Sequence, residues 1–403
     1  MPKITKTIKA RDLWNTIIES ATKTGEPGII MIDTMRNWVP ANVYWLHHTT
    51  NPCSVFAISG PKHPLTGKET GDSCRLMAIN LSSFVLEPFT EKANFDFSSF
   101  KSSASIMARL ADDLVDLEIE KLDNLIQISE TDEERDIYRE LLNSAVQGRR
   151  VGNGTFGLAD CLAKLCIRYD SDVAVEMVGK IFSTFRDATY LTSSELAKER
   201  GSFPVFDWDK EKENAFIKAL PQHIRDSIEK HGRRNISLLT NAPTGSVAIV
   251  AKSSSGIEPV FRNSYIRRRK LSVGDGGRSD FVDALGDRWQ EYEVFHPNVL
   301  EYMRLFPGIQ LPDFFVTSDQ INWRKRIDVQ AAAQVNLDHS ISSTLNLPKG
   351  TPSSVISDIY LEGWHKGLKG ITVYVDGSRS GVLITKKDQD FPQRDATRRP
   401  DSL

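Results

Sequence analysis

The sequence SISSTLNLPKGTPSSVISDIYLEGWHKGLKGITVYV, residues 340–375, decides the fold class of the chain. Residues 340–347 and 369–375 are predicted to be strands, and residues 353–367 between them are predicted to be a helix. The side chains that this helix is expected to bury are Val355, Ile356, Ile359, Tyr360 and Trp364. A strand, a helix and a strand in this order form a βαβ unit, which requires a parallel strand pair and a right-handed crossover. We therefore predict an α/β fold.

Further elements are expected upstream of this unit. They are a helix over residues 10–24 that ends at Gly25 and Pro27, a buried strand over 28–33, helices over 102–147 and after Gly157, and a strand over 236–240.

Residues 38–74 lack this periodicity. They are rich in Pro, Gly, His and Thr and contain two cysteines. Long loops without regular structure inside compact domains are usually functional. The polar residues 386–403 are predicted to be a tail.

The overall composition excludes several classes of protein. Hydrophobic residues make up 40% and charged residues 26% of the 403 residues, which excludes a chain disordered throughout. The 51 basic and 53 acidic residues give a net charge of −2, which argues against a nucleic-acid partner. The sequence contains no run of eighteen apolar residues and no apolar segment typical of a signal peptide. We expect a cytoplasmic chain with no membrane partner.

Residues 152–157, GNGTFG, match the glycine pattern of dinucleotide-binding proteins. That pattern binds a pyrophosphate only where it follows a strand and begins a helix. Here the preceding residues 134–147 are predicted to be helical. We therefore interpret the glycines as positions of close helix approach, and a nicotinamide-dependent dehydrogenase is disfavoured.

A second loop is better placed to bind an anion. It lies between the strand over 236–240 and a short apolar helix, and it contains Ala242, Pro243, Thr244, Gly245 and Ser246. Backbone N–H groups at a helix start, together with two hydroxyl groups, suit a phosphate. A plain N-cap turn would have the same sequence, so the spacing leaves both interpretations open.

Cys53 lies in the middle of the aperiodic region, directly after Asn51 and Pro52. Cys74 follows 21 residues later, just before the apolar run 76–81. A cysteine held in a rigid turn suggests chemistry. The alternative for either cysteine is a small, inert, buried side chain.

The remaining candidates have simpler interpretations. Cys161 and Cys166 are expected to fill the core of a helical region. The chain contains no CxxC or HxxxH pair, so no zinc or other metal site is expected. The basic run 267–270 is predicted to be a solvated strand end, with contact to an anionic substrate as the alternative.

Several blocks of this sequence, in this order, resemble the adenosylcobalamin-dependent (class II) ribonucleotide reductases. They are TNPC (50–53), DSCRLMAINL (72–81), APTGSVAIVAKSSSGIEPVF (242–261), RRRKL (267–271), VFHPNVLEYM (294–303), DHSISSTLNLP (338–348) and KGITVYVDGSRSGVL (369–383). The order and number of the blocks carry the resemblance, which spans nearly the whole chain.

The resemblance implies the C-terminal half of a ten-stranded α/β barrel, with a central finger loop over about 48–74 and extra helices, within a barrel domain over 1–385. It implies that Cys53 forms the thiyl radical at the enclosed centre of the barrel, where Asn51 contacts the ribose. Cys74 would be one of the two cysteines that supply electrons. The loop 242–246 would bind the substrate phosphates.

The implied activity is the radical-based reduction of ribonucleotides, with diphosphates favoured, to deoxyribonucleotides. The implied cofactor is adenosylcobalamin, and a thioredoxin-like or other dithiol would be the reductant. A half-barrel is expected to expose a sheet edge and an apolar inner face, so the missing N-terminal half is an expected partner. A homodimer of the complete enzyme is a further expectation.

Three features depart from the family pattern. Val55 occupies the position where the family finger usually has a glutamate that acts as general base. The upstream half-barrel, which carries the partner of Cys74, is not part of this sequence, and neither is a tail with re-reducing cysteines. Two alternatives therefore stay open: an impaired remnant that only binds nucleotide or partner, and a fragment of a class I large subunit, although the later blocks favour the cobalamin type.

Overall fold

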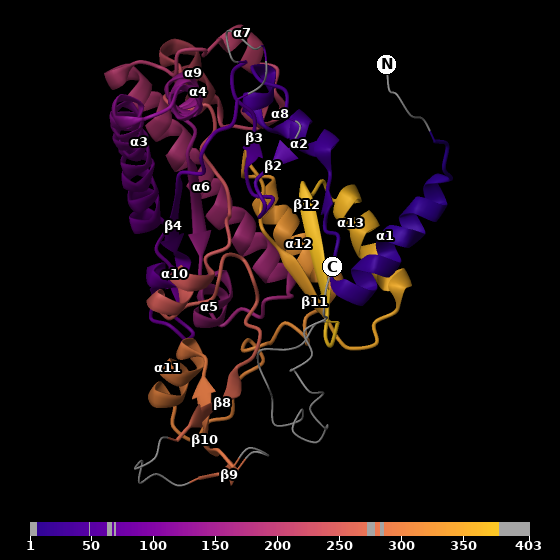
Figure 1. Cartoon of the computed structure of the whole chain (residues 1–403). Coiled ribbons are helices and arrows are strands. Elements are labelled where there is room, and N and C mark those ends of the chain that lie inside the picture. Colours follow the sequence, from indigo (N-terminus) through magenta and orange to yellow (C-terminus); the bar gives the residue numbers. More distant parts are fainter. Residues whose placement is uncertain are drawn as a thin grey trace.

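The computed structural model describes residues 6–47, 49–62, 67, 70–271, 279–282 and 286–378 (Figure 1). The predicted tail over 386–403 and the end of the last sequence block lie outside these residues. Within them, no helix is both long enough and apolar enough to cross a membrane.

A row of parallel strand segments forms the centre of the fold. β4 (Leu76–Asn80) pairs in parallel with β7 (Gly152–Phe156), and β11 (Thr344–Leu347) pairs in parallel with β12 (Gly370–Val375). Parallel bridges from Asn153 to Leu239 and from Asn241 to Ile341 join the two pairs through the segment around 239–241. These contacts place five parallel segments side by side, in the same order as in the sequence. This is the arrangement expected for half of the barrel. Barrel closure is not seen among the described residues, since β4 pairs there only with β7.

The predicted βαβ unit is confirmed, because α13 (Ser353–His365) connects the parallel strands β11 and β12. The longer helices elsewhere are α1 (Ala10–Thr24), α3 (Phe97–Ile128), α4 (Asp132–Gly148), α6 (Asp172–Arg200), α9 (Gln222–His231), α11 (Pro297–Leu305) and α12 (Trp323–Gln334). The shorter helices are α2 (Ile32–Trp38), η1 (Pro40–Val43), η2 (Leu81–Phe84), α5 (Leu158–Lys164), α7 (Trp208–Glu211), α8 (Ala215–Lys218) and α10 (Gly245–Ala251). The remaining strands are β1 (Ile29–Ile30), β2 (Thr49–Thr50), β3 (Ala57–Ile58), β5 (Val85–Leu86), β6 (Asn94–Phe95), β8 (Ser264–Lys270), β9 (Phe281–Val282) and β10 (Arg288–Phe295).

Local sequence signals explain where the long helices begin. Asp96 caps α3 by accepting a hydrogen bond from the backbone N–H of Ser99. Thr131 and Glu134 form a capping box at the start of α4, and Ser171 caps α6. The apolar faces of α3 and α6 pack together with α5 and α9 into the largest core cluster of the described chain.

The two faces of β11 and β12 differ in polarity. The outward side chains pack against α1, α12 and α13 and are Leu345, Leu347, Ile371, Val373 and Val375. Successive side chains of a strand point to opposite faces, so the inner face carries Ser342, Thr344, Asn346, Thr372 and Tyr374. The hydroxyl groups of Thr344 and Thr372 lie 2.9 Å apart on this face. The expectation of an apolar inner face is therefore wrong for these strands, because only their outer face belongs to the core.

Some local predictions are also wrong. The strand expected over 28–33 is the two-residue edge strand β1, antiparallel to β12, and the chain then turns into α2. Trp364 is 57% exposed because it lies on the solvent side of α13. Cys161 is buried as expected, but Cys166 is exposed because it follows the end of α5 in a left-handed backbone conformation.

The basic run 267–270 lies on β8, which pairs with β10 in an arm at the lower end of Figure 1. Arg268 forms an ion pair with Glu291 across the two strands, and Lys270 forms one with Asp287. These contacts agree with a solvated strand on which Arg268 and Lys270 are paired within the arm.

The finger loop is held on the inner face by a buried arginine. Arg150 is fully buried, and its Nε atom donates a hydrogen bond to Asp72 Oδ2 at 3.0 Å. Its two terminal nitrogens donate to the carbonyl oxygens of Ala57 and Ser59 at 2.9 and 2.7 Å. Arg150 lies two residues before β7, so these bonds fix the finger to the start of that strand.

Two glycines of the GNGTFG motif make room for neighbouring chain segments. A Cβ atom on Gly152 would lie 2.3 Å from Cζ of Phe56, a finger residue that stacks on His339 with the ring centroids 4.4 Å apart. A Cβ atom on Gly154 would lie 2.5 Å from the carbonyl oxygen of Thr240. The glycines therefore permit close approach of the finger and of the next strand segment, and not of a helix as predicted.

We predict that Arg150→Met lowers the free energy of unfolding by about 3–5 kcal/mol, because it removes one of the two arginines that pair with the buried Asp72 carboxylate and also removes the donor to two carbonyl oxygens. Urea denaturation measures the change. The matched control is Arg139→Met, which removes the exposed ion pair with Asp136 and should change stability by less than about 1 kcal/mol. Equal losses in both variants would contradict the assigned role of Arg150.

We predict that Gly152→Ala lowers stability by about 1–3 kcal/mol, because the new methyl group collides with the Phe56 ring. In the control, Gly179→Ala, the methyl group meets no atom within 4 Å in the interior of α6, so stability should rise by about 0.5–1 kcal/mol. Thermal denaturation of both variants checks the prediction. A Gly152→Ala protein as stable as the original would show that the finger is not packed on β7.

Candidate active site

The tip of the finger is a tight turn organised by Asn51. The side-chain oxygen of Asn51 accepts hydrogen bonds from the backbone N–H groups of Val55 and Phe56, each at 3.0 Å. Its carbonyl oxygen accepts from the N–H of Ser54 at 2.9 Å, and Ser54 has a positive φ of 59°. The turn occupies the oxygen of the Asn51 amide, so its NH₂ group is the part that can contact a ligand.

Cys53 lies in this turn and is exposed. The expectation that its thiol is enclosed at the centre of a barrel is therefore wrong for the described chain. The physical reason is that the described strands form an open row, in which β4 pairs only with β7, so that no closed barrel surrounds the finger.

Cys74 lies two residues before β4 and is also classed as exposed. Partial burial nevertheless raises the pKa of its thiol, and the negative charge of Asp72 raises it further, against the lowering effect of Arg150. A raised pKa keeps Cys74 in the thiol form at neutral pH.

Val55 anchors the base of the finger. Its side chain is fully buried, and its carbonyl oxygen accepts hydrogen bonds from Thr240 Oγ1 at 2.9 Å and from the N–H of Ser340 at 3.0 Å. Thr240 leads directly into the loop 242–246, and Ser340 leads into β11. Position 55 therefore connects the finger to both segments but offers no group that can accept a proton from a ligand.

In the loop 242–246 the Thr244 side chain is already bonded. Its hydroxyl oxygen accepts from the N–H of Gly256 at 2.9 Å, and its own N–H donates to Ser255 Oγ at 3.2 Å. Gly245 and Ser246, at the start of α10, are exposed. An anion on this loop would therefore bind to Ser246 and to the free N–H groups of the first helical turn.

A hollow of about 540 Å³ adjoins this loop on the inner face of the strands. Its polar lining comes from the inner face and from the chain that follows α10, and includes Ser254, Ser255, Glu258, Arg262, Tyr265, His296, Thr344, Asn346 and Tyr374. Sequence reasoning missed this hollow. The alternating polar residues of SISSTLNL and KGITVYV were the signal for it, because strands buried on both faces would have been apolar throughout.

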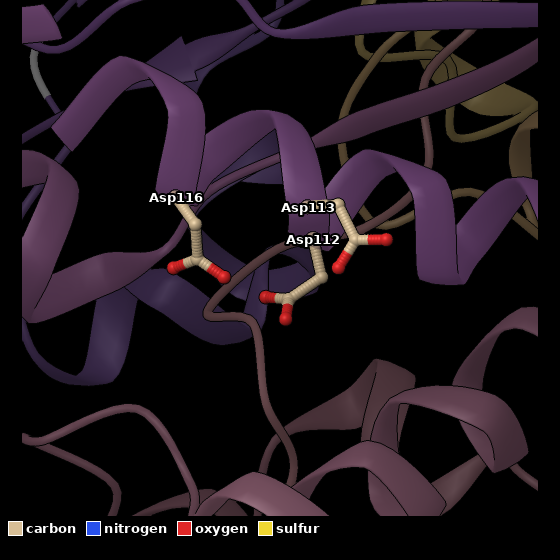
Figure 2. Close-up of side chains that lie close together, drawn as sticks. All are labelled: Asp112, Asp113 and Asp116. Atoms are coloured by element: carbon tan, nitrogen blue, oxygen red, sulfur yellow. The ribbon is translucent and has the colours of Figure 1, made fainter. Parts of the chain in front are cut away.

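A group of carboxylates on α3 is shown in Figure 2: Asp112, Asp113 and Asp116. Arg149 lies 2.8 Å from Asp112 and 2.7 Å from Asp116, and Arg200 lies 2.7 Å from Asp113. Arginine therefore neutralises each carboxylate, and the cluster has the character of an ion-pair network joining helices. It gives no reason to assign a cation.

Comparisons with known proteins place the chain in a family. The model of the ribonucleotide reductase barrel domain matches residues 1–374. The vitamin B12-dependent ribonucleoside-diphosphate reductase of Mycobacterium tuberculosis is 28% identical and that of Thermoplasma acidophilum 29% identical, each over 95% of this chain. These matches cover 49% and 44% of the relatives, so the chain spans about half their length.

A solved structure agrees in fold. The class Id ribonucleotide reductase alpha subunit of Actinobacillus ureae superposes on 91% of this chain and 61% of its own, with a TM-score of 0.63 at 19% identity. The family match over residues 1–374 and this shared fold lead to one conclusion: the chain belongs to the ribonucleotide reductase barrel domain family.

Proposed function

We propose that this chain is the finger-loop half of a ribonucleotide reductase, and that it reduces ribonucleoside diphosphates together with a separate N-terminal half. One observation carries the proposal. Cys53 lies on a turn whose base, Val55, is bonded to Thr240 and Ser340, the residues that lead into the loop 242–246 and the polar inner face. The names of the relatives from Mycobacterium tuberculosis and Thermoplasma acidophilum support a diphosphate substrate.

The proposed chemistry assigns one task to each residue. A ribose C–H bond is too strong for acid–base chemistry, so Cys53 acts as a thiyl radical that removes the 3′-hydrogen atom and returns it to C3′ at the end of the reduction. The Asn51 NH₂ group contacts the ribose, and the loop 242–246 holds the phosphates. Two thiols, Cys74 and a cysteine of the N-terminal half, are oxidised to a disulfide while the 2′-hydroxyl leaves as water. A thioredoxin-like dithiol then reduces that disulfide.

The proposed cofactor is adenosylcobalamin, which when bound would supply the radical that activates Cys53. The exposed position of Cys53 fits a radical source that reaches it from outside this chain. The described residues of the turn, Asn51 to Val55, include no group specific to a cobalamin, so a class I-type radical source fits the same thiol.

Exposed apolar surface on this chain supports the proposal that an N-terminal half binds to it. In the described chain the outer edge of β4 is unpaired, and Leu76 on that strand is exposed. Beside the proposed phosphate loop, Ile249 and Val250 of α10 are 80% and 85% exposed. Free strand edges and apolar patches of this kind are covered in stable proteins, and the missing half of the barrel would cover both.

We predict that the complex with the N-terminal half, supplied with adenosylcobalamin and a dithiol, converts a ribonucleoside diphosphate to its deoxy product. Cys53→Ser should abolish turnover, because serine cannot carry the radical, and Cys74→Ser should also abolish it, because the one remaining thiol cannot supply two electrons by forming a disulfide. Chromatography of the nucleotides measures both. Cys166→Ser, at an exposed cysteine outside the site, is the control and should keep full activity. Turnover by the Cys53→Ser complex would refute the assignment.

Val55 favours a second candidate function, a non-catalytic chain that only binds nucleotide or its partner half. Val55→Glu distinguishes the two functions. If the original complex is inactive and the variant is active, the chain is an impaired enzyme; if both bind nucleotide and neither turns it over, the chain is a binding remnant. The free energy of unfolding of the variant should fall by about 1–3 kcal/mol, since it buries a carboxyl group in place of a fully buried valine.

A further inference from the structure

An aspartate and a histidine form a hydrogen-bonded pair at the wall of the inner-face hollow. His296 lines the hollow, and its Nε2 atom lies 2.7 Å from Oδ1 of Asp160 on α5. The Asp160 side chain is almost fully buried, whereas the His296 side chain keeps some exposure. Neither residue of this pair has a role in the function proposed above.

A run of three serines fixes this pair relative to the proposed phosphate loop. Oδ2 of Asp160 accepts hydrogen bonds from Ser253 Oγ at 3.0 Å and from the N–H of Ser254 at 2.8 Å. The next residue, Ser255, accepts from the N–H of Thr244 in the loop 242–246. A single tripeptide therefore sets both the position of the carboxylate and the position of the loop.

The geometry determines which nitrogen of His296 is free to react. The Asp160 oxygen atoms accept from two other donors, which is the behaviour of a carboxylate, so the Nε2 atom of His296 carries the proton between them. In the neutral ring the Nδ1 atom then has a free lone pair. Among the described residues this Nδ1 atom has no hydrogen-bond partner, so it can accept a proton from a molecule in the hollow.

The carboxylate and the guanidinium that line the hollow are already engaged. Glu258 accepts hydrogen bonds from Arg326 and from the N–H of Thr344, at 3.0 and 2.9 Å. Arg262 forms an ion pair with Asp319 at 2.9 Å. His296 is therefore the described side chain of the hollow best suited to act as a base.

We propose that His296, oriented by Asp160, accepts a proton from a ribose hydroxyl group of the bound nucleotide, a task that Val55 cannot perform. This inference rests on the proposed function. In the step, the O–H bond of the ribose hydroxyl breaks, its electron pair stays on the oxygen, and a new N–H bond forms at Nδ1. The charge of the resulting imidazolium is balanced by Asp160.

The first test observes His296 directly. The complex with the N-terminal half, with ¹⁵N-labelled histidine in this chain, is titrated with a ribonucleoside diphosphate and with its 3′-deoxy counterpart. The ribonucleotide should shift the Nδ1 resonance that disappears in His296→Gln, because the hydroxyl donates to it, and the 3′-deoxy nucleotide should shift it much less. Binding of both nucleotides with no difference at His296 would overturn this inference alone. If no nucleotide binds, the proposed function fails as well.

The second test uses turnover and rescue. His296→Gln should lower kcat by about 10²–10⁴-fold, with a much smaller effect on nucleotide affinity, since it removes a base and not a binding group. Adding Val55→Glu to that variant should recover at least about tenfold of the loss, because the glutamate restores a base at the finger. The control is His223→Gln, at an exposed position of α9, which should leave kcat unchanged.

Full turnover by His296→Gln would refute the proposal. So would a loss of turnover accompanied by an equal loss of nucleotide affinity and no rescue by Val55→Glu, because that pattern indicates a purely structural role.

Discussion

The buried guanidinium of Arg150 is the contact on which the site depends. It donates hydrogen bonds to Asp72 and to the carbonyl oxygens of Ala57 and Ser59. If these residues moved away from the start of β7, charged and polar groups would lose their partners. Burial lowers the pKa of Arg150, while the charge of Asp72 opposes that shift. Such a buried pair contributes little net stability but is expensive to break. Phe56 and the turn that contains Cys53 directly precede the residues that Arg150 holds, so their positions depend on this contact.

The same strands serve two purposes on their two faces. On the outer face of β11 and β12, apolar side chains from Leu345 to Val375 pack against helices and stabilise the fold. On the inner face, hydroxyl and amide groups line a hollow beside the loop 242–246. The two faces differ because successive side chains of a strand point to opposite sides. One strand can therefore contribute apolar side chains to the core and polar side chains to the site. The serines 253–255 then connect the loop to the pair formed by Asp160 and His296.

Sequence reasoning predicted the parts that depend on local pattern. The helix over 10–24 and the parallel βαβ unit are confirmed, since helical spacing and the order of the elements specify them directly. The sequence did not reveal which partners long-range contacts would provide. The glycines of GNGTFG proved to accommodate Phe56 and a neighbouring strand segment, and Asp160 lies 136 residues from the histidine that it orients. Local sequence patterns do not indicate contacts between residues so far apart in the chain.

The measurement that tests the central claim most directly is an experimental structure of this chain with its N-terminal half and a ribonucleoside diphosphate. We expect the diphosphate on the loop 242–246, the ribose in the inner-face hollow, and the Cys53 sulfur in van der Waals contact with the 3′-carbon. A nucleotide bound elsewhere, or a finger whose thiol points away from the sugar, would contradict the reductase account.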